Sequence, residues 1–231
     1  PLPAALITRF LDYSLPYHHL FGLDSGPGLR RRLVDAGALL LVRLHVEGFF
    51  WGDCSLSNVL FRRDAGALMA YLVDAETVER RDVPLPDPYR EHELDLAEEN
   101  IAGGLADLQA AGRLDPAIDP FDVAHELRRR YDDLWAEVTR VDELDIADRH
   151  LIEERVRALN DLGFDVEELA IEATEGGTRL RVRPSLVEEG HHARELRRRT
   201  GLEVQENQAR RLLGDIEAFR AWLEQEEGQP V

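Results

Sequence analysis

The sequence predicts a mainly helical α+β fold, because helical and strand-like hydrophobic periods alternate along its 231 residues. Apolar residues recur at helical spacing from Leu29 to about Val46 and again in several later segments. Short apolar runs around turn residues predict one β-hairpin within residues 58–73 and a second at residues 166–183. With 44% hydrophobic and 32% charged residues, the composition is that of an ordinary globular protein.

The N-terminal part is predicted to contain a strand, a long helix and a hairpin, in that order. Residues 6–11 are apolar and strand-like, and a Gly/Pro-rich break precedes the helix, which Gly48 is expected to end. The two hairpin strands, Asn58–Arg62 and Leu68–Val73, flank the turn sequence Arg-Asp-Ala-Gly.

After the first hairpin the chain is predicted to be helical, apart from the second hairpin. Prolines 84, 86 and 88 predict an extended connector, because proline interrupts a helix. Asp119 or Asp122 is expected to cap one of the helices that follow, and Trp135 and Trp222 lie on apolar helix stripes that predict burial. The predicted helices cover residues 89–112, from 119 or 122 to 138, 145–162, 191–200 and 205–226.

Charge and cysteine content narrow the class of protein. The formal net charge of −18 argues against general nucleic-acid binding, although it permits a nucleotide that binds together with a metal ion. The single cysteine, Cys54, cannot form an internal disulfide, which favours a reducing, cytoplasmic environment. No apolar stretch has the length of a membrane span, and no secretory leader opens the sequence.

Three polar residues around the first hairpin are the strongest candidates for chemistry. Asp53 comes five residues before Asn58, and Asp74 ends the apolar run that follows. Phosphoryl transfer needs an oriented hydroxyl, metal ions that bridge phosphates, and cationic groups. Asp53 is the candidate to accept the proton of the hydroxyl, while Asn58 and Asp74 are candidate Mg²⁺ ligands. Each residue alone also fits an ordinary role as a cap, a turn residue or a strand end.

The order of these elements resembles a known family. A long helix ends in Leu-His-x-x-Gly, the sequence Gly-Asp-x-x-x-x-Asn follows, and the hairpin ends in Val-Asp. Residues from about Leu6 to Ala111 therefore resemble the C-terminal lobe of kinase-like enzymes, nearest the lipopolysaccharide-kinase and aminoglycoside-phosphotransferase branch. The resemblance implies that Asp53 is the catalytic base, and that Asn58 and Asp74 bind Mg²⁺ and thereby ATP.

The resemblance has further implications and some departures. Leu6–Asp12 is similar to the hinge strand that faces the adenine, and Asp95 to a buried helix aspartate that bonds the catalytic loop, although Asp95 also fits an ordinary helix charge. Trp51 replaces the usual histidine, and Ala75 the usual phenylalanine or tryptophan. All 28 basic residues are arginine, so the phosphate-binding lysine is absent. The small lobe is expected upstream of Pro1 if the chain is a fragment, and catalysis is not expected if it is complete.

The remainder, from about Val73, resembles an uncharacterised domain attached to lipopolysaccharide-kinase-like domains in GC-rich bacteria. The stretches that carry this resemblance include Val73–Thr77, Glu99–Gly103 and Thr200–Leu213. No activity follows from it. The expected division is a kinase-like lobe at 1–111 and a helical domain with a β-hairpin at 112–231.

Two functions fit these observations. The first is an ATP-dependent phosphotransferase that acts on a small-molecule or saccharide hydroxyl, with its small lobe missing from this chain. The second is a catalytically inactive, pseudokinase-like binding or regulatory module whose C-terminal domain binds a protein partner. Asp53, Asn58 and Asp74 favour the first function. Trp51, Ala75 and the missing lysine favour the second, so whether the protein is an enzyme stays open.

A basic cluster near the C-terminus is the other feature that can bind a ligand. It can dock a phosphate or a nucleic acid, but pairing with neighbouring glutamates on a solvated face is the expected outcome. The cluster comprises Arg194, Arg197, Arg198, Arg199, Arg210 and Arg211.

Overall fold

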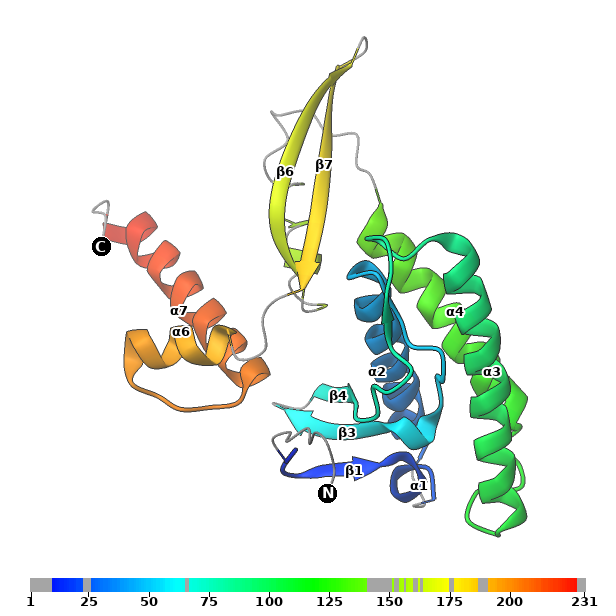
Figure 1. The fold of residues 1–231 in the computed structure, drawn as a ribbon. Helices are drawn as coiled ribbons and strands as arrows, with labels where there is room; N and C mark the ends of the chain where they lie inside the picture. Colours follow the sequence, from blue (N-terminus) through cyan, green and yellow to red (C-terminus); the bar gives the residue numbers. More distant parts are fainter. Residues whose placement is uncertain are drawn as a thin grey trace, which may run out of the picture.

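The computed structural model is a mainly helical α+β structure (Figure 1). It describes residues 10–22, 26–64, 67–140, 151, 154–155, 157–159, 162, 164–174, 177–186 and 191–227. The helices are α1 (Tyr17–Leu20), α2 (Pro27–Val46), the short 3-10 helix η1 (Leu56–Asn58), α3 (Asp87–Ala110), α4 (Pro120–Thr139), α6 (His191–Thr200) and α7 (Glu206–Glu227). The strands are β1 (Ser14–Pro16), β2 (Phe49–Phe50), β3 (Val59–Asp64), β4 (Ala67–Leu72), β5 (Glu79–Arg80), β6 (Phe164–Thr174) and β7 (Gly177–Leu186).

Helices α2, α3 and α4 pack together and enclose the main core, as Figure 1 shows. The apolar residues of each helix recur every three or four positions, so each helix buries one stripe. Of the two predicted caps of α4, the structure uses Asp119, whose side chain accepts a hydrogen bond of 2.8 Å from the N–H of Phe121. The core therefore runs beyond the predicted boundary at residue 111 and includes the apolar stripe of α4.

A three-stranded antiparallel sheet, in the order β1–β3–β4, lies beside α2 (Figure 1), which β4 contacts. The predicted first hairpin is confirmed as β3 and β4, which pair from Val59 opposite Leu72 to Asp64 opposite Ala67. The sequence did not predict β1, a three-residue edge strand that pairs with β3 and ends in Pro16. Proline is tolerated at this edge, since the strand has a partner on one side only.

Some sequence predictions need correction. Helix α3 begins at Asp87 rather than at residue 89, because Pro88 occupies the first turn, where its missing N–H removes no helical hydrogen bond. Most of the predicted hinge strand lies outside the described residues, and its last positions, Phe10–Asp12, form no strand. The predicted helix at 145–162 also lies largely outside them, although residues 151, 154–155 and 157–159 are helical.

The C-terminal elements are smaller units. Strands β6 and β7 confirm the second hairpin and extend it beyond its predicted ends. Helices α6 and α7 form a pair set apart from the α2–α3–α4 bundle (Figure 1), and among the described side chains of the pair the buried apolar ones are Leu196, Ala209 and Leu213. Trp135 packs against the main core as predicted, but the prediction for Trp222 is wrong, because 52% of this residue is exposed.

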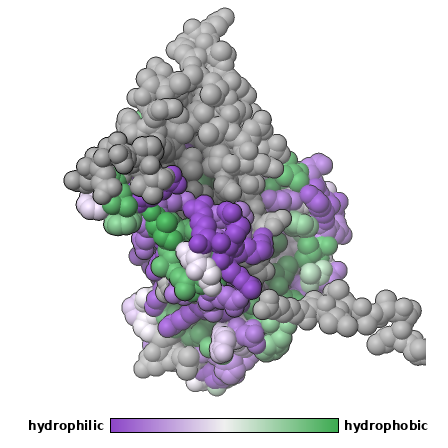
Figure 2. Space-filling model, turned by 90° about the vertical axis from the view of Figure 1, so that its left-hand side faces the viewer, coloured by the Kyte–Doolittle hydropathy of each residue, from purple (hydrophilic) through white to green (hydrophobic). Residues whose placement is uncertain are grey.

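Hydrophilic side chains predominate among the coloured residues of the face seen in Figure 2, where hydrophobic ones form small separate patches. No helix within the described ranges combines the length and the apolar character needed to cross a membrane.

Candidate functional site

The loop between β2 and β3 presents Asp53 at the surface. Asp53 is exposed and Asn58, at the end of η1, is half-buried. The side-chain amide of Asn58 donates to Oδ2 of Asp53 over 3.1 Å and to its backbone carbonyl over 3.4 Å. The structure therefore brings these two predicted site residues together.

The β3–β4 register places Asp74 near the same loop. Asn58 lies opposite Val73, whose N–H donates to the Asn58 carbonyl over 3.0 Å, and Asp74 is the next residue. Asp74 is exposed, and its Oδ1 accepts a hydrogen bond of 3.3 Å from the N–H of Glu76. The hairpin therefore carries Asn58 and Asp74 at its open end. Within the described residues, no three His, Cys, Asp or Glu side chains are grouped to hold a metal ion.

A buried carboxylate that the sequence analysis missed holds the loop from below. Oε1 of Glu93 accepts hydrogen bonds from the N–H groups of Trp51 (2.7 Å) and Gly52 (2.8 Å). Gly52 has a φ of +79°, a conformation that favours glycine, so these two successive N–H groups can converge on one oxygen. Glu93 is fully buried on α3 and is thereby fixed relative to the core.

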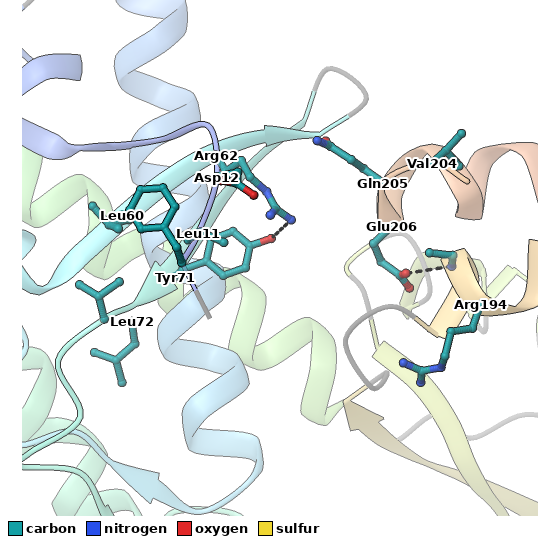
Figure 3. A pocket seen from close by; sticks show the side chains of 13 residues that line it. Leu11, Asp12, Leu60, Arg62, Tyr71, Leu72, Arg194, Val204, Gln205 and Glu206 are labelled. Carbon is teal, nitrogen blue, oxygen red and sulfur yellow. Dashed lines mark hydrogen bonds between the residues drawn. The ribbon is translucent and has the colours of Figure 1, made fainter. Parts of the chain in front are cut away.

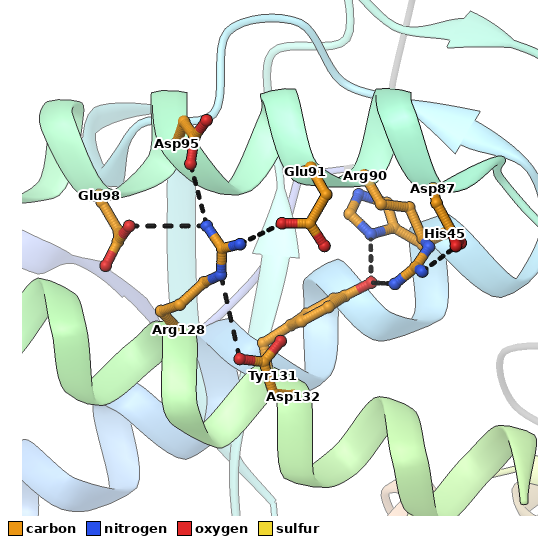
Figure 4. A network of polar contacts seen from close by, with 9 residues as sticks. All are labelled: His45, Asp87, Arg90, Glu91, Asp95, Glu98, Arg128, Tyr131 and Asp132. Atoms are coloured by element: carbon orange, nitrogen blue, oxygen red, sulfur yellow. Dashed lines mark hydrogen bonds and ion pairs between the residues drawn. The ribbon is translucent and has the colours of Figure 1, made fainter.

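The polar network continues from Glu93 into the core (Figure 4 shows its His45, Tyr131 and Arg90 part). Nε2 of His45 lies 2.8 Å from Oε2 of Glu93, and Nδ1 lies 2.7 Å from the hydroxyl of Tyr131. Arg90 donates to the same hydroxyl oxygen over 3.3 Å, and its guanidinium lies 4.0 Å from the ring centroid of Trp135. The contacts of His45 are satisfied when it donates from Nε2 to the carboxylate and Tyr131 donates to Nδ1.

Burial raises the pKa of Tyr131 well above its ordinary value, although Arg90 acts in the opposite direction. The hydroxyl therefore stays protonated over the range in which proteins work, and it remains able to donate to His45. The network joins helices α2, α3 and α4 directly beneath the Asp53 loop.

Asp95, the predicted loop-binding aspartate, does not reach the loop. It is exposed on α3 and pairs with Arg128 of α4 over 3.0 Å, together with the carboxylates of Glu91 and Glu98 (Figure 4). The residue that performs the predicted contact is Glu93, two positions earlier. Glu93 lies four residues before buried Ala97 and eight before buried Ile101, so helical periodicity alone could have found it.

Helix α3 holds the loop at a second point. The side-chain amide of Asn100 donates to the carbonyl of Cys54 over 3.0 Å. Burial is the main cause that raises the pKa of the Cys54 thiol, and this disfavours the thiolate needed for nucleophilic chemistry. The side chain of Trp51 is buried in the core next to the loop, and its indole Nε1 has no hydrogen-bond partner among the described residues.

A cavity of about 790 Å³ lies between the β3–β4 hairpin and the α6–α7 pair (Figure 3). One wall includes Leu60, Arg62 and Tyr71, and the other includes Val204 and Gln205. Arg62 donates to the hydroxyl of Tyr71 over 2.9 Å and lies 5.0 Å from the centroid of its ring. The hairpin side of the cavity therefore presents an aromatic ring and a guanidinium, and Asp12 adds a carboxylate to the lining.

Part of the basic cluster is neutralised by neighbouring glutamates, as predicted. Arg198 and Arg199 both bond to Glu195, and Arg197 pairs with Glu203 over 3.1 Å. The hydrogen bonds from Arg198 and Arg199 are the main cause that lowers the pKa of Glu195, to about 2. These three arginines therefore belong to a solvated, self-paired surface.

Comparisons with known proteins give a family match over part of the chain and a similarity to a solved structure. Residues 133–230, less than half of the chain, match the model of a family described as a domain of unknown function (DUF4032). No curated protein matches the sequence. Among solved structures, the chain is similar to WaaP in complex with acyl carrier protein, with 18% sequence identity and a TM-score of 0.41. That alignment covers 66% of this chain and 59% of the other, so this chain spans less than two thirds of the solved protein's length.

Proposed function

We propose that this chain carries the metal- and acceptor-binding half of an ATP-dependent phosphotransferase of the kinase-like superfamily. In this proposal Asp53 binds the acceptor hydroxyl, and Asn58 and Asp74 hold Mg²⁺ on the phosphates of ATP. The acceptor class, a small-molecule or saccharide hydroxyl, is carried over from the family resemblance.

The observation that carries the proposal is the fixed position of the Asp53 loop. Glu93 binds two successive N–H groups of the loop, and Asn100 binds the carbonyl of Cys54. Three hydrogen bonds to buried or half-buried side chains on one helix are more than a surface turn needs. Such support is expected where a side chain has to be presented in one orientation, because misplacement by about 1 Å can cost 10²-fold in rate.

The residues at the open end of the hairpin fit a magnesium ion. Mg²⁺ prefers oxygen ligands and takes only one or two carboxylates from the protein, with water and phosphate oxygens completing its shell. Asn58 offers an amide oxygen, and Asp74 offers a carboxylate of which Oδ1 alone meets the Glu76 N–H. When bound, the ion would neutralise charge on the phosphate oxygens, a need made greater by the absence of lysine from the sequence.

The residues of the chain have defined tasks in this reaction. The Asp53 carboxylate accepts the proton of the acceptor hydroxyl. The oxygen of that hydroxyl forms a bond to the γ-phosphorus of ATP. The bond from that phosphorus to the bridging oxygen breaks, and ADP leaves with the electron pair. Asn58, which donates to Asp53 from its amide nitrogen, orients the carboxylate and keeps its amide oxygen available to the metal.

Calorimetric titration of the chain with ATP, with and without Mg²⁺, tests the metal role. We expect Mg²⁺ to strengthen ATP binding to the wild type, and we expect Asp74→Asn to abolish that gain. Glu76→Gln is the matched control, because it neutralises an exposed carboxylate two residues away. Equal Mg²⁺ dependence in the wild type and Asp74→Asn would remove Asp74 from the metal site.

The second candidate is a non-catalytic nucleotide-binding or regulatory module, in which the part of the chain after the α2–α3–α4 bundle contacts a protein partner. The observation that favours it is the anchoring of the loop by the apolar side chain of Trp51, at the position where the resembled family has a polar histidine. Single-turnover measurements with ATP separate the two candidates. If the wild type cleaves ATP and Asp53→Asn does not, the result supports the enzyme. If the wild type and Asp53→Asn bind ATP equally and neither cleaves it, the result supports the module. A cytoplasmic location belongs to both proposals.

A further inference from the structure

The α6–α7 pair faces the same surface of the hairpin that leads to the candidate metal site. Side chains alternate along a strand, so Leu60 and Arg62 lie on one face of β3, and Tyr71 lies opposite Leu60 on β4. At the open end of the hairpin, the Val73 N–H donates to the carbonyl of Asn58 over 3.0 Å. Val73 also lines the cavity, and Asp74 follows it directly. The cavity therefore extends to the end of the hairpin where Asp74 follows β4.

The wall formed by α6 and α7 has a defined structure. Glu206, the first residue of α7, accepts hydrogen bonds from the N–H groups of His192 (2.9 Å) and Ala193 (3.0 Å), and Nδ1 of His192 lies 2.6 Å from it. These contacts join the starts of the two helices. They satisfy N–H groups that the first turn of α6 leaves without helical partners. Val204 and Gln205, which precede Glu206, are thereby held at the cavity (Figure 3).

The lining of the cavity suits a flat, partly apolar group with a polar edge. Leu60 and Val204 supply apolar surface from opposite walls, and the Arg62–Tyr71 pair supplies a stacked, cationic one. Figure 3 shows the side chain of Gln205 extending from the segment before α7 toward the hairpin, where its amide can both donate and accept. The volume of about 790 Å³ falls within the range of about 300–1,000 Å³ that is typical of small-molecule sites.

We propose that α6 and α7 form one wall of the nucleotide site, so that the base and ribose of ATP lie between the β3–β4 hairpin and the α6–α7 pair. This inference rests on the proposed function, because it takes the phosphates to be held at Asn58 and Asp74. It assigns a binding role to a segment inside the 133–230 match, a region whose family description states no function. The C-terminal helices contribute directly to the site, and nucleotide binding links them to the kinase-like part of the chain.

A pair of glutamine substitutions on α7 and the turn before it tests the inference. Gln205→Trp places a large ring in the cavity, whereas Gln208→Trp makes the same change at an exposed position of α7 that does not line it. We expect Gln205→Trp to weaken Mg·ATP binding at least tenfold in calorimetric titration, and Gln208→Trp to leave it at the wild-type value. Circular dichroism of both variants checks that the helices are intact.

Hydrogen exchange of the wild type gives a readout that needs no substitution. Saturating Mg·ATP is expected to slow exchange at the amides of residues 193–206 as well as in β3 and β4. Two results together would overturn the role of α6–α7 while the proposed function stands. They are equal ATP binding by the wild type and Gln205→Trp, and no added protection at residues 193–206 when ATP binds. Absence of ATP binding by the wild type would overturn both.

Discussion

The helical bundle and the α6–α7 pair are stabilised in different ways. The difference indicates which of the two can hold the residues of a site in fixed positions. The bundle has a continuous apolar core that surrounds a hydrogen-bonded polar network. The described part of the pair has three buried apolar residues and a surface of paired arginines and glutamates. A buried polar network is tolerated only where its groups find partners and the surrounding packing holds them. The bundle therefore fixes the Asp53 loop, while the pair supplies a wall that can shift at lower energetic cost.

The largest expected effect on stability is a difference between substitutions of two carboxylates on α3. Glu93→Ala should destabilise the fold by about 3–5 kcal/mol, because it leaves two loop N–H groups and His45 without their buried partner. Asp95→Ala removes an exposed carboxylate and should cost at most about 1 kcal/mol. Urea unfolding of both variants measures the difference, and similar costs would contradict the assigned roles.

A smaller effect is expected in the α6–α7 pair. Leu196→Ala should cost this pair about 2–3 kcal/mol, since Leu196 is fully buried in a small core that can partly collapse around the gap. The control is Leu202→Ala, because Leu202 is 52% exposed. Native-state hydrogen exchange should show faster exchange in α6 and α7 while the amides of α3 keep their protection. Equal loss of protection in α3 would show that the two regions unfold as one unit.

The smallest effect concerns pH and again falls on the α6–α7 pair. Burial alone would raise the pKa of Glu206, but hydrogen bonds from the N–H groups of Ala193 and His192 outweigh it and lower this pKa below its ordinary value of 4.5. Because the pKa of Glu206 is lower in the folded than in the unfolded state, its ionised carboxylate stabilises the pair at pH values above the unfolded-state pKa. This stabilisation is lost as the pH falls below about 4.5. Glu206→Gln should therefore remove part of the acid-induced loss of amide protection in α6. An identical pH profile in the variant would exclude Glu206 as its source.

The same contrast explains what the sequence could predict. The helical period located α2, α3 and α4, and turn residues located both hairpins, because these signals lie within a few residues of one another. The bond from the loop to α3 spans 42 residues of sequence, from Trp51 to Glu93, so no local pattern announces it. The family resemblance pointed to an aspartate and so selected Asp95, whereas the apolar stripe of α3 carries Glu93 on its buried side.

Other features depended on tertiary contacts from the start. Strand β1 is three residues long and exists because β3 offers it a free edge. The amphipathic pattern of α7 predicted burial of Trp222, but its ring stacks on Phe219 at the surface, with centroids 5.7 Å apart. The three predicted site residues differ in how the structure connects them. A hydrogen bond joins Asn58 to Asp53, whereas Asp74 lies near them only through the β3–β4 register.

Paramagnetic broadening by Mn²⁺ tests the central claim most directly, because Mn²⁺ binds the same oxygen ligands as Mg²⁺. In the ¹⁵N-labelled chain with ATP present, substoichiometric Mn²⁺ should broaden the amide signals of Asn58 and Asp74 first. The signals around Asp95, on the exposed side of α3, should stay sharp. Broadening that begins at Asp95 or at the acidic surface in general, with Asn58 and Asp74 unaffected, would contradict the proposed metal site.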